Sequence, residues 1–178
     1  NTGRVVCEDC PPGQYTDIMQ QQNCVECSPG SFTDQNRTVT CSTCVAGKHQ
    51  SGFGGTACVE CELGRALQTD GKAECNDCAG GFYANTTGLL TCLGCTVGRA
   101  QLFAGMSSCE LCEVGKLNPN TNQKLCGLCQ PGRYTSRNGT LVCDLCEIGK
   151  SQTNQGKSAC TNCTAGTFAS KQGLSTCT

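Results

Sequence analysis

The stretch CVECSPGSFTDQNRTVTCSTC, residues 24–44, contains the pattern that decides the fold. Two cysteines separated by two residues are followed by thirteen residues and then by the next such pair. One cysteine series repeats every 17 residues, at Cys7, Cys24, Cys41, Cys58, Cys75, Cys92, Cys109, Cys126, Cys143, Cys160 and Cys177. A second series follows the first ten members by three, from Cys10 to Cys163. The chain is therefore a C-x2-C-x13 array of ten copies without insertion or deletion, which is typical of stacked repeats.

Composition supports a scaffold held by cysteine. The chain has 178 residues, 21 of them Cys, and a net charge of −1. Leu, Ile, Val and Phe together number 29, which is too few for a single apolar core. A Cys content this high is typical of a disulfide-rich domain from an oxidising compartment. The low net charge argues against disorder.

The ends set the expected organisation. Residues 1–6 align with the back half of a repeat, residues 7–176 form ten tandem repeats, and residues 177–178 begin a next repeat or end the array. The first residues do not resemble a signal peptide. We expect the array to continue upstream, where Cys7 would find its partner.

Glycine recurs at fixed places, counting the first Cys of each repeat as position 1. Position 7 is Gly in all ten copies, which predicts a positive φ or a close backbone approach. Position 14 is Gly in seven copies, and the pairs Asp70-Gly71 and Asn138-Gly139 favour tight turns. We expect a short strand after the position-7 glycine, a turn at positions 13–14 and a return toward the next Cys.

Copies fall into two kinds. Copies of the first kind have an aromatic residue at position 9, and copies of the second mostly have an aliphatic residue at position 6 with Lys or Arg at position 8. A bulky side chain thus tends to appear at position 6 where position 9 has none. This predicts that the side chains at the two positions fill the same space between copies.

Three disulfide patterns are compatible with the spacing. The first joins the second Cys of one copy to the first Cys of the next, and it uses Cys10–Cys24, Cys27–Cys41, Cys44–Cys58, Cys61–Cys75, Cys78–Cys92, Cys95–Cys109, Cys112–Cys126, Cys129–Cys143, Cys146–Cys160 and Cys163–Cys177. The second links copies in twos, and the third closes each C-x2-C pair. The first is favoured because the two kinds of copy do not alternate as a 34-residue period requires.

The segments CPPGQYTDIMQQQNC (10–24), CSPGSFTDQNRTVTC (27–41) and CQPGRYTSRNGTLVC (129–143) resemble ephrin-receptor-like cysteine-rich repeats and the first module of tumour-necrosis-factor-receptor cysteine-rich domains. In the latter family the two Cys that flank the Gly and the aromatic residue bond each other, which supports the first pattern. The second receptor module and the kinase and ligand-binding domains are absent. The resemblance implies an extracellular rod-like array without an assigned ligand, and it extends to surface and ciliary-hair proteins of eukaryotic microbes.

Other chemistries are disfavoured. In zinc sites with four Cys ligands the cysteines occur in groups of four, whereas the cysteine pairs of this chain are evenly spaced and show no such grouping. The acidic residues inside many C-x2-C pairs raise a thiol pKa, which is unfavourable for redox catalysis. His49 takes the place of an aromatic residue, and we expect a packed ring there. The chain has no basic block that would favour nucleic-acid binding and no apolar run long enough to span a membrane. We therefore expect no enzyme, no cofactor, no bound metal and no membrane contact by this segment.

Sequons for N-linked glycans occur at Asn36, Asn85, Asn138 and Asn162. The first three lie near the predicted turns and Asn162 lies inside a C-x2-C pair. Ser and Thr richness also permits O-linked sugar.

The sequence thus predicts a small disulfide-rich, mainly β fold: an elongated rod of ten hairpin repeats, about 130 Å long at ~3.3 Å per residue. The expected function is that of a structural extracellular glycoprotein segment in a cell-surface or fibrillar assembly. Its expected partners are glycans and neighbouring copies or other extracellular proteins. The alternative is a receptor ectodomain stalk that binds a protein ligand.

Overall fold

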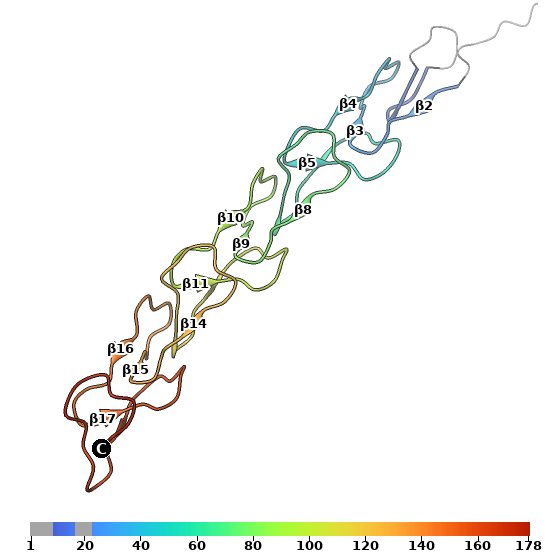
Figure 1. The fold of residues 1–178 in the computed structure, drawn as a ribbon. Coiled ribbons are helices and arrows are strands. Elements are labelled where there is room, and N and C mark those ends of the chain that lie inside the picture. The colour runs from blue at the N-terminus through green and yellow to red at the C-terminus, as the bar shows by residue number, and fades with distance from the viewer. Residues whose placement is uncertain (1–8, 17–22) are drawn as a thin grey trace, which may run out of the picture. The chain divides into compact units, whose positions relative to one another are not determined.

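The structure, a computed structural model, describes residues 9–16 and 23–178 (Figure 1). These residues form short antiparallel hairpins whose strands each have two residues, and they contain no helix. The strands are β1 (Gln14–Tyr15), β2 (Val25–Glu26), β3 (Ser31–Phe32), β4 (Ser42–Thr43), β5 (Lys48–His49), β6 (Val59–Glu60), β7 (Arg65–Ala66), β8 (Asn76–Asp77), β9 (Phe82–Tyr83), β10 (Leu93–Gly94), β11 (Arg99–Ala100), β12 (Glu110–Leu111), β13 (Lys116–Leu117), β14 (Gly127–Leu128), β15 (Arg133–Tyr134), β16 (Asp144–Leu145), β17 (Lys150–Ser151) and β18 (Thr161–Asn162). The expected disulfide-rich, mainly β class is confirmed.

A tight turn precedes the first strand of each hairpin. In the eighth repeat the Arg133 N–H donates to the Gln130 carbonyl at 3.0 Å. Gly132, third residue of this turn, has a φ of +78°, the value that a type II turn requires at that place. Pro131 precedes it, and a proline ring favours the second position of the same turn. The glycine at position 7 is therefore required by local backbone geometry.

The second strand of each hairpin lies after the cysteine that the sequence predicted it would precede. Strand β15 pairs with β16 in the register Arg133↔Leu145 and Tyr134↔Asp144, so the returning strand follows Cys143 rather than preceding it. The expected turn at positions 13–14 is present, as at Asn138-Gly139, but only the glycine has a positive φ. It is thus not the two-residue hairpin turn that an Asn-Gly pair favours.

Disulfides close these hairpins in the first of the three predicted patterns. Nine bonds join cysteines 14 residues apart, with Cα–Cα distances of 5.6–5.8 Å: Cys10–Cys24, Cys27–Cys41, Cys44–Cys58, Cys61–Cys75, Cys95–Cys109, Cys112–Cys126, Cys129–Cys143, Cys146–Cys160 and Cys163–Cys177. Cys78 and Cys92 are disulfide-bonded as well. The two other patterns are therefore wrong, and Cys7 lies outside the described residues.

Backbone hydrogen bonds join each repeat to the next at fixed positions. The Gly115 N–H donates to the Thr135 carbonyl at 2.9 Å, and the Asn118 N–H donates to the Thr140 carbonyl at 3.0 Å. In the opposite direction, the Gly139 N–H donates to the Cys112 carbonyl at 2.7 Å. The same bonds recur from repeat to repeat inside each unit described below. One inserted residue would break several of them at once, which explains the strict 17-residue period.

Most position-7 glycines also approach the repeat after next, as Gly13, Gly30, Gly47, Gly81, Gly98, Gly115 and Gly132 do. A Cβ built on Gly132 would lie 2.1 Å from the carbonyl oxygen of Gly173, 41 residues later, and a Cβ on Gly115 would meet Gly156 at the same distance. No side chain fits there. The glycine thus serves both the turn and the stack.

The buried interior is narrow and consists mainly of sulfur. The second Cys of each pair from Cys10 to Cys146 is buried, Cys163 is half-buried, and Leu67 is buried against the Cys61–Cys75 bond. The expectation that position-6 side chains share this space is wrong. Leu63 and Ile148 are 53% and 66% exposed, because position 6 belongs to the turn and faces solvent. This interior supplies little apolar burial, so covalent closure takes its place.

The chain divides into two compact units. The first contains Asn1–Asp77 with Ala84–Cys92, and the second contains Cys78–Tyr83 with Leu93–Thr178. Each unit is built from the same hairpins.

Candidate functional site

All four sequon asparagines are exposed. Asn36 and Asn138 lie in the turns at positions 13–14, and Asn85 lies in the equivalent loop of its repeat. Asn162 belongs instead to β18, where it pairs with Lys150. Glycosylation of these residues stays a prediction, and the geometry leaves the first three side chains at loop ends that an enzyme can reach.

Position 10 holds buried polar side chains that sequence reasoning missed. Gln101 is only 4% exposed, and its side-chain oxygen accepts from the Phe103 N–H at 3.1 Å while its amide nitrogen donates to the Ser108 carbonyl at 2.9 Å. Gln50 and Gln152 make the same two bonds in their own repeats. One side chain thus holds both ends of the loop that links two strands.

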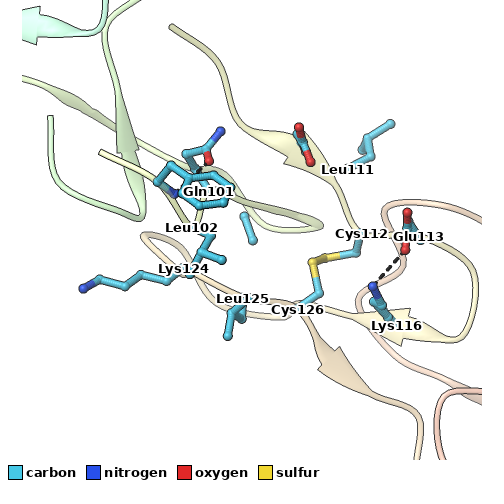
Figure 2. A pocket seen from close by; sticks show the side chains of 12 residues that line it. Gln101, Leu102, Leu111, Cys112, Glu113, Lys116, Lys124, Leu125 and Cys126 are labelled. Atoms are coloured by element: carbon cyan, nitrogen blue, oxygen red, sulfur yellow. Dashed lines mark hydrogen bonds and ion pairs between the residues drawn. A yellow bond between two sulfur atoms is a disulfide. The ribbon is translucent and has the colours of Figure 1, made fainter. Parts of the chain in front are cut away.

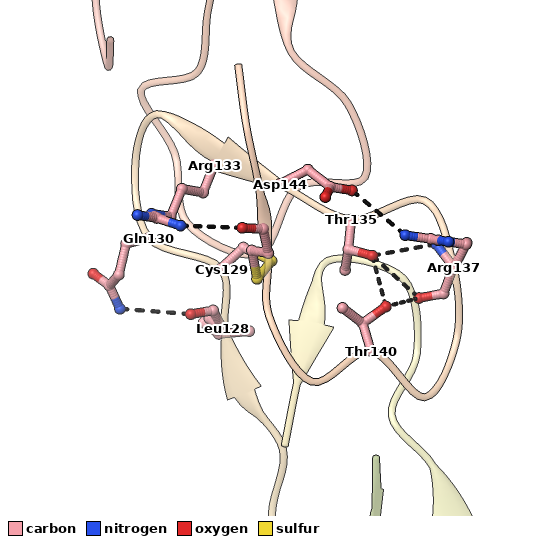
Figure 3. Close-up of a disulfide and its surroundings, with 9 residues drawn as sticks. Leu128, Cys129, Gln130, Arg133, Thr135, Arg137, Thr140 and Asp144 are labelled. Carbon is pink, nitrogen blue, oxygen red and sulfur yellow. Dashed lines mark hydrogen bonds and ion pairs between the residues drawn. A yellow bond between two sulfur atoms is a disulfide. The ribbon is translucent and has the colours of Figure 1, made fainter. Parts of the chain in front are cut away.

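In other repeats threonine replaces glutamine at position 10 and also forms hydrogen bonds within its loop. Figure 3 shows Thr135, which is fully buried, with its hydroxyl 2.8 Å from that of Thr140; the Thr140 hydroxyl also donates to the Arg137 carbonyl at 2.9 Å. Thr33 and Thr38 form the same hydroxyl pair at 2.7 Å. These bonds satisfy polar groups that would otherwise be buried without partners.

These residues reveal a longer period of 51 residues, or three repeats. Gln50, Gln101 and Gln152 are 51 apart, and so are the aromatic residues Phe32, Tyr83 and Tyr134. In the second unit, β11 and β17 are three repeats apart and appear in the same orientation (Figure 1). The three loop sequons fall in the repeats that begin at Cys24, Cys75 and Cys126, which share this spacing. A comparison of position 10 across every third copy would have revealed the pattern.

A groove of about 320 Å³ lies over the sixth and seventh repeats, inside the second unit (Figure 2). Its apolar wall comes from Leu102, Phe103, Leu111 and Leu125, all exposed. Charged side chains of both signs also line it: Lys116, which pairs with Glu113, together with Lys124 and Glu110. The groove is open and shallow, so it suits the surface of another macromolecule better than a small substrate.

Charged side chains are arranged differently in the two units. In the first, the position-8 cation faces an acid across the strand pair, with Lys48–Glu60 at 3.6 Å and Arg65–Asp77 at 2.8 Å. In the second, a leucine lies opposite three of the four cations, with Arg99 facing Leu111, Lys116 facing Leu128 and Arg133 facing Leu145, whereas Lys150 faces Asn162.

Two lysines of the second unit pair with glutamates of their own turns. Lys116 lies 2.8 Å from Glu113, and Lys150 lies 2.8 Å from Glu147. The hydrogen bond from each lysine, aided by its charge, lowers the pKa of the glutamate. The hydrogen bond to Glu147 likewise raises the pKa of Lys150. These pairs are exposed and contribute little to stability.

One group of side chains in the described residues has metal-ligand spacing. It consists of His49, Cys61 and Cys75, whose ligand atoms lie within 4.8 Å of one another. Cys61 and Cys75 are bonded to each other, and the His49 Nδ1 lies 3.3 Å from the Cys75 sulfur. A zinc ligand is a thiolate, so the intact disulfide does not fit a metal. His49 is half-buried and lies against the bond, in the packed position expected of it.

Comparison with known proteins places the first part of the chain. Residues 1–39 match the family model described as tyrosine-protein kinase ephrin type A/B receptor-like. Together with the disulfides described above, this match supports a cysteine-rich repeat array whose residues 1–39 are similar to that family. No curated protein matches the chain. Within the described residues, no helix has the length and apolar character needed to cross a membrane.

Proposed function

We propose that this chain is a structural segment of an extracellular glycoprotein, a disulfide-closed scaffold in a cell-surface or fibrillar assembly. The observation that carries this proposal is that every cysteine from Cys10 to Cys177 is disulfide-bonded. Bonds of this number persist in oxidising compartments and are rare in the cytosol. The matched ephrin-receptor-like domains are generally non-enzymatic, and a scaffold needs no catalysis.

Regular stacking supports the scaffold function. The inter-repeat hydrogen bonds recur with the same partners inside each unit, so each unit maintains a constant spacing between its own exposed loops. We propose that N-linked glycans occupy Asn36, Asn85 and Asn138 on those loops. Glycans at a three-repeat spacing would cover one loop in three and leave the loops between them open to protein contacts.

The test uses the full chain secreted from eukaryotic cells. Its intact mass is measured without reduction, before and after alkylation of thiols and before and after glycosidase treatment. We expect no more than the single odd cysteine to be alkylated, and a mass loss with glycosidase that maps to the three loop asparagines. Several free thiols, or a stoichiometric metal ion, would refute the proposal.

The groove over the sixth and seventh repeats favours a second candidate, a receptor stalk that binds a protein ligand. A ligand site breaks the repeat symmetry at one patch, and this groove is a local feature of that kind. Substitution of Leu125 by Ser in a displayed ectodomain should then abolish capture of one defined ligand, whereas a scaffold would lose no ligand.

A further inference from the structure

Opposite net charges separate the two units. The first carries ten acidic and five basic side chains, and the second carries four acidic and eight basic. Their net charges are therefore −5 and +4, although the whole chain is nearly neutral. An array of identical repeats has no reason to divide its charge in this way for folding alone.

The asymmetry arises at equivalent positions of the repeats. Position 3 is acidic at Asp9, Glu26, Glu60 and Asp77 in the first unit, and it is Leu at 111, 128 and 145 in the second. The acids of the first unit include Glu62 and Glu74, which are exposed and form no ion pair with a described side chain. In the second unit Lys124 and Lys157 are likewise exposed and form no ion pair with a described side chain.

We propose that the basic second unit of this chain binds the acidic first unit of another copy. Complementary potentials of this kind steer association and fix its register, and they disfavour contact between like units. The partner is a second copy because the chain itself supplies both charges in nearly equal amounts. This proposal rests on the assembly function proposed above and names the partner for it.

The groove over the sixth and seventh repeats is where the contact would centre on the second unit. It offers exposed Leu111 and Leu125 as apolar area, and its lining charges are balanced, so the attraction comes from the net charge of the unit and the groove supplies apolar contact. Interfaces gain affinity from buried apolar and aromatic side chains, and Phe103 at 65% exposure supplies an aromatic one.

Two matched variants test the charge argument. Lys72 and Lys157 both occupy position 15 after a turn glycine, both are exposed, and both accept a neighbouring repeat's N–H through the backbone carbonyl at 3.4 Å. Lys72→Glu and Lys157→Glu each change the net charge of the chain from −1 to −3. Lys157→Glu lowers the second unit to +2, whereas Lys72→Glu makes the first unit −7.

The measurement is sedimentation equilibrium of the full, deglycosylated chain at about 50 mM and about 500 mM salt, which shortens the screening length severalfold. We expect association at low salt that weakens at high salt. Lys157→Glu should weaken it about threefold or more and Lys72→Glu should strengthen it. A shift of both variants in the same direction would reflect net repulsion and would overturn the proposal, as would a monomer at every concentration.

A second pair of variants tests the place of contact. Phe103 and Phe168 are similarly exposed in the same unit, at 65% and 62%, but only Phe103 lines the groove. Phe103→Ser should weaken association and Phe168→Ser should not; equal effects would refute the groove as the contact. A chain whose cysteines are bonded and whose asparagines carry glycans before deglycosylation, but which stays monomeric after it, would refute this proposal alone. Free thiols would refute the scaffold function, and the association result could still be interpreted.

Discussion

The position-7 glycine meets two separate requirements, and the array allows them to be measured apart. Gly132 and Gly149 have φ values of +78° and +82°, so each turn needs a residue that tolerates the left-handed region. A Cβ on Gly132 would also collide with the Gly173 carbonyl, whereas this 178-residue sequence has no residue 41 places after Gly149, and a Cβ there would meet nothing within 4 Å. The two sites therefore share the backbone cost of an alanine and differ only in the clash.

We predict that Gly149→Ala lowers the free energy of unfolding by about 1–2 kcal/mol, because of the left-handed backbone alone. Gly132→Ala should lower it by about 1–3 kcal/mol more, because the stack must open to admit the methyl group. Guanidinium chloride unfolding followed by circular dichroism measures both. Equal losses would show that the close approach to Gly173 carries no energy.

The Glu147–Lys150 pair gives a pH-dependent prediction. The pKa of Glu147 is lowered by its hydrogen bond with Lys150, so the carboxylate's small stabilising effect is present above its unfolded pKa of about 4.3 and is lost as the pH falls through the folded value. The raised pKa of Lys150 contributes below about 10.4 and is lost as the pH rises through its folded value. The pair is thus intact across neutral pH.

In Lys150→Met, the pKa of Glu147 should rise toward its ordinary value, as measured by carboxyl-carbon NMR titration of the folded chain. The pKa of Glu113, which has its own lysine at 2.8 Å, serves as the internal reference and should stay low. A Glu147 titration unchanged by the substitution would mean that the pair does not form in solution.

Single residues differ in how far the sequence could predict them. Gly132 was predictable because glycine occupies position 7 in every repeat, whatever its neighbours. Gln101 was not, because position 10 is Thr, Gln, Leu, Ala or Asn when consecutive repeats are compared, and its burial depends on a loop that only the fold supplies. Exposed Ile148 was also misjudged, since an aliphatic side chain in a turn looks like core material until the turn is placed.

At the scale of the hairpin, covalent closure and backbone bonds act on the same residue. Cys129 bonds Cys143, its N–H donates to the Gly115 carbonyl at 2.9 Å, and its carbonyl accepts from the Gly156 N–H at 2.9 Å. Two-residue strands are too short to be stable alone. The hairpin therefore depends on its disulfide and on its neighbours together, and the cysteine pairing was predictable from spacing while the strand register was not.

Replacement of both Cys129 and Cys143 by Ala should lower the free energy of opening this hairpin by about 3 kcal/mol, the chain-entropy value for a loop of this length. Hydrogen exchange should show the loss in the eighth repeat and its immediate neighbours, because each repeat bonds only to copies near it. Amides of the repeat closed by Cys44–Cys58, in the first unit, provide the control and should keep their protection. Loss of protection across the whole second unit would contradict this local view.

At the scale of the whole molecule, the three-repeat period matters more than the number of repeats. Loop-holding glutamines recur every 51 residues, as Gln50, Gln101 and Gln152 do, so repeats with the same loop type lie three places apart. The 17-residue spacing of cysteine hides this order, because sulfur and glycine are the same in every copy. The array is thus uniform in its backbone and ordered in threes in its side chains.

Two deletions distinguish the 17-residue backbone repeat from the 51-residue order of side chains. Removal of residues 92–142 takes out three whole repeats and keeps the order of types, whereas removal of residues 109–125 takes out one repeat and brings together types that are not adjacent in the natural chain. We expect the larger deletion to keep its guanidinium midpoint and the smaller to lose on the order of 1 kcal/mol of stability, because loops of types that are not natural neighbours then pack against each other. Stability of a stacked array depends on nearest-neighbour interfaces more than on length, so the 51-residue loss should be the milder change. If the one-repeat deletion were as stable as the natural chain, the side-chain order would have no energetic role, and the 17-residue backbone unit alone would define the fold.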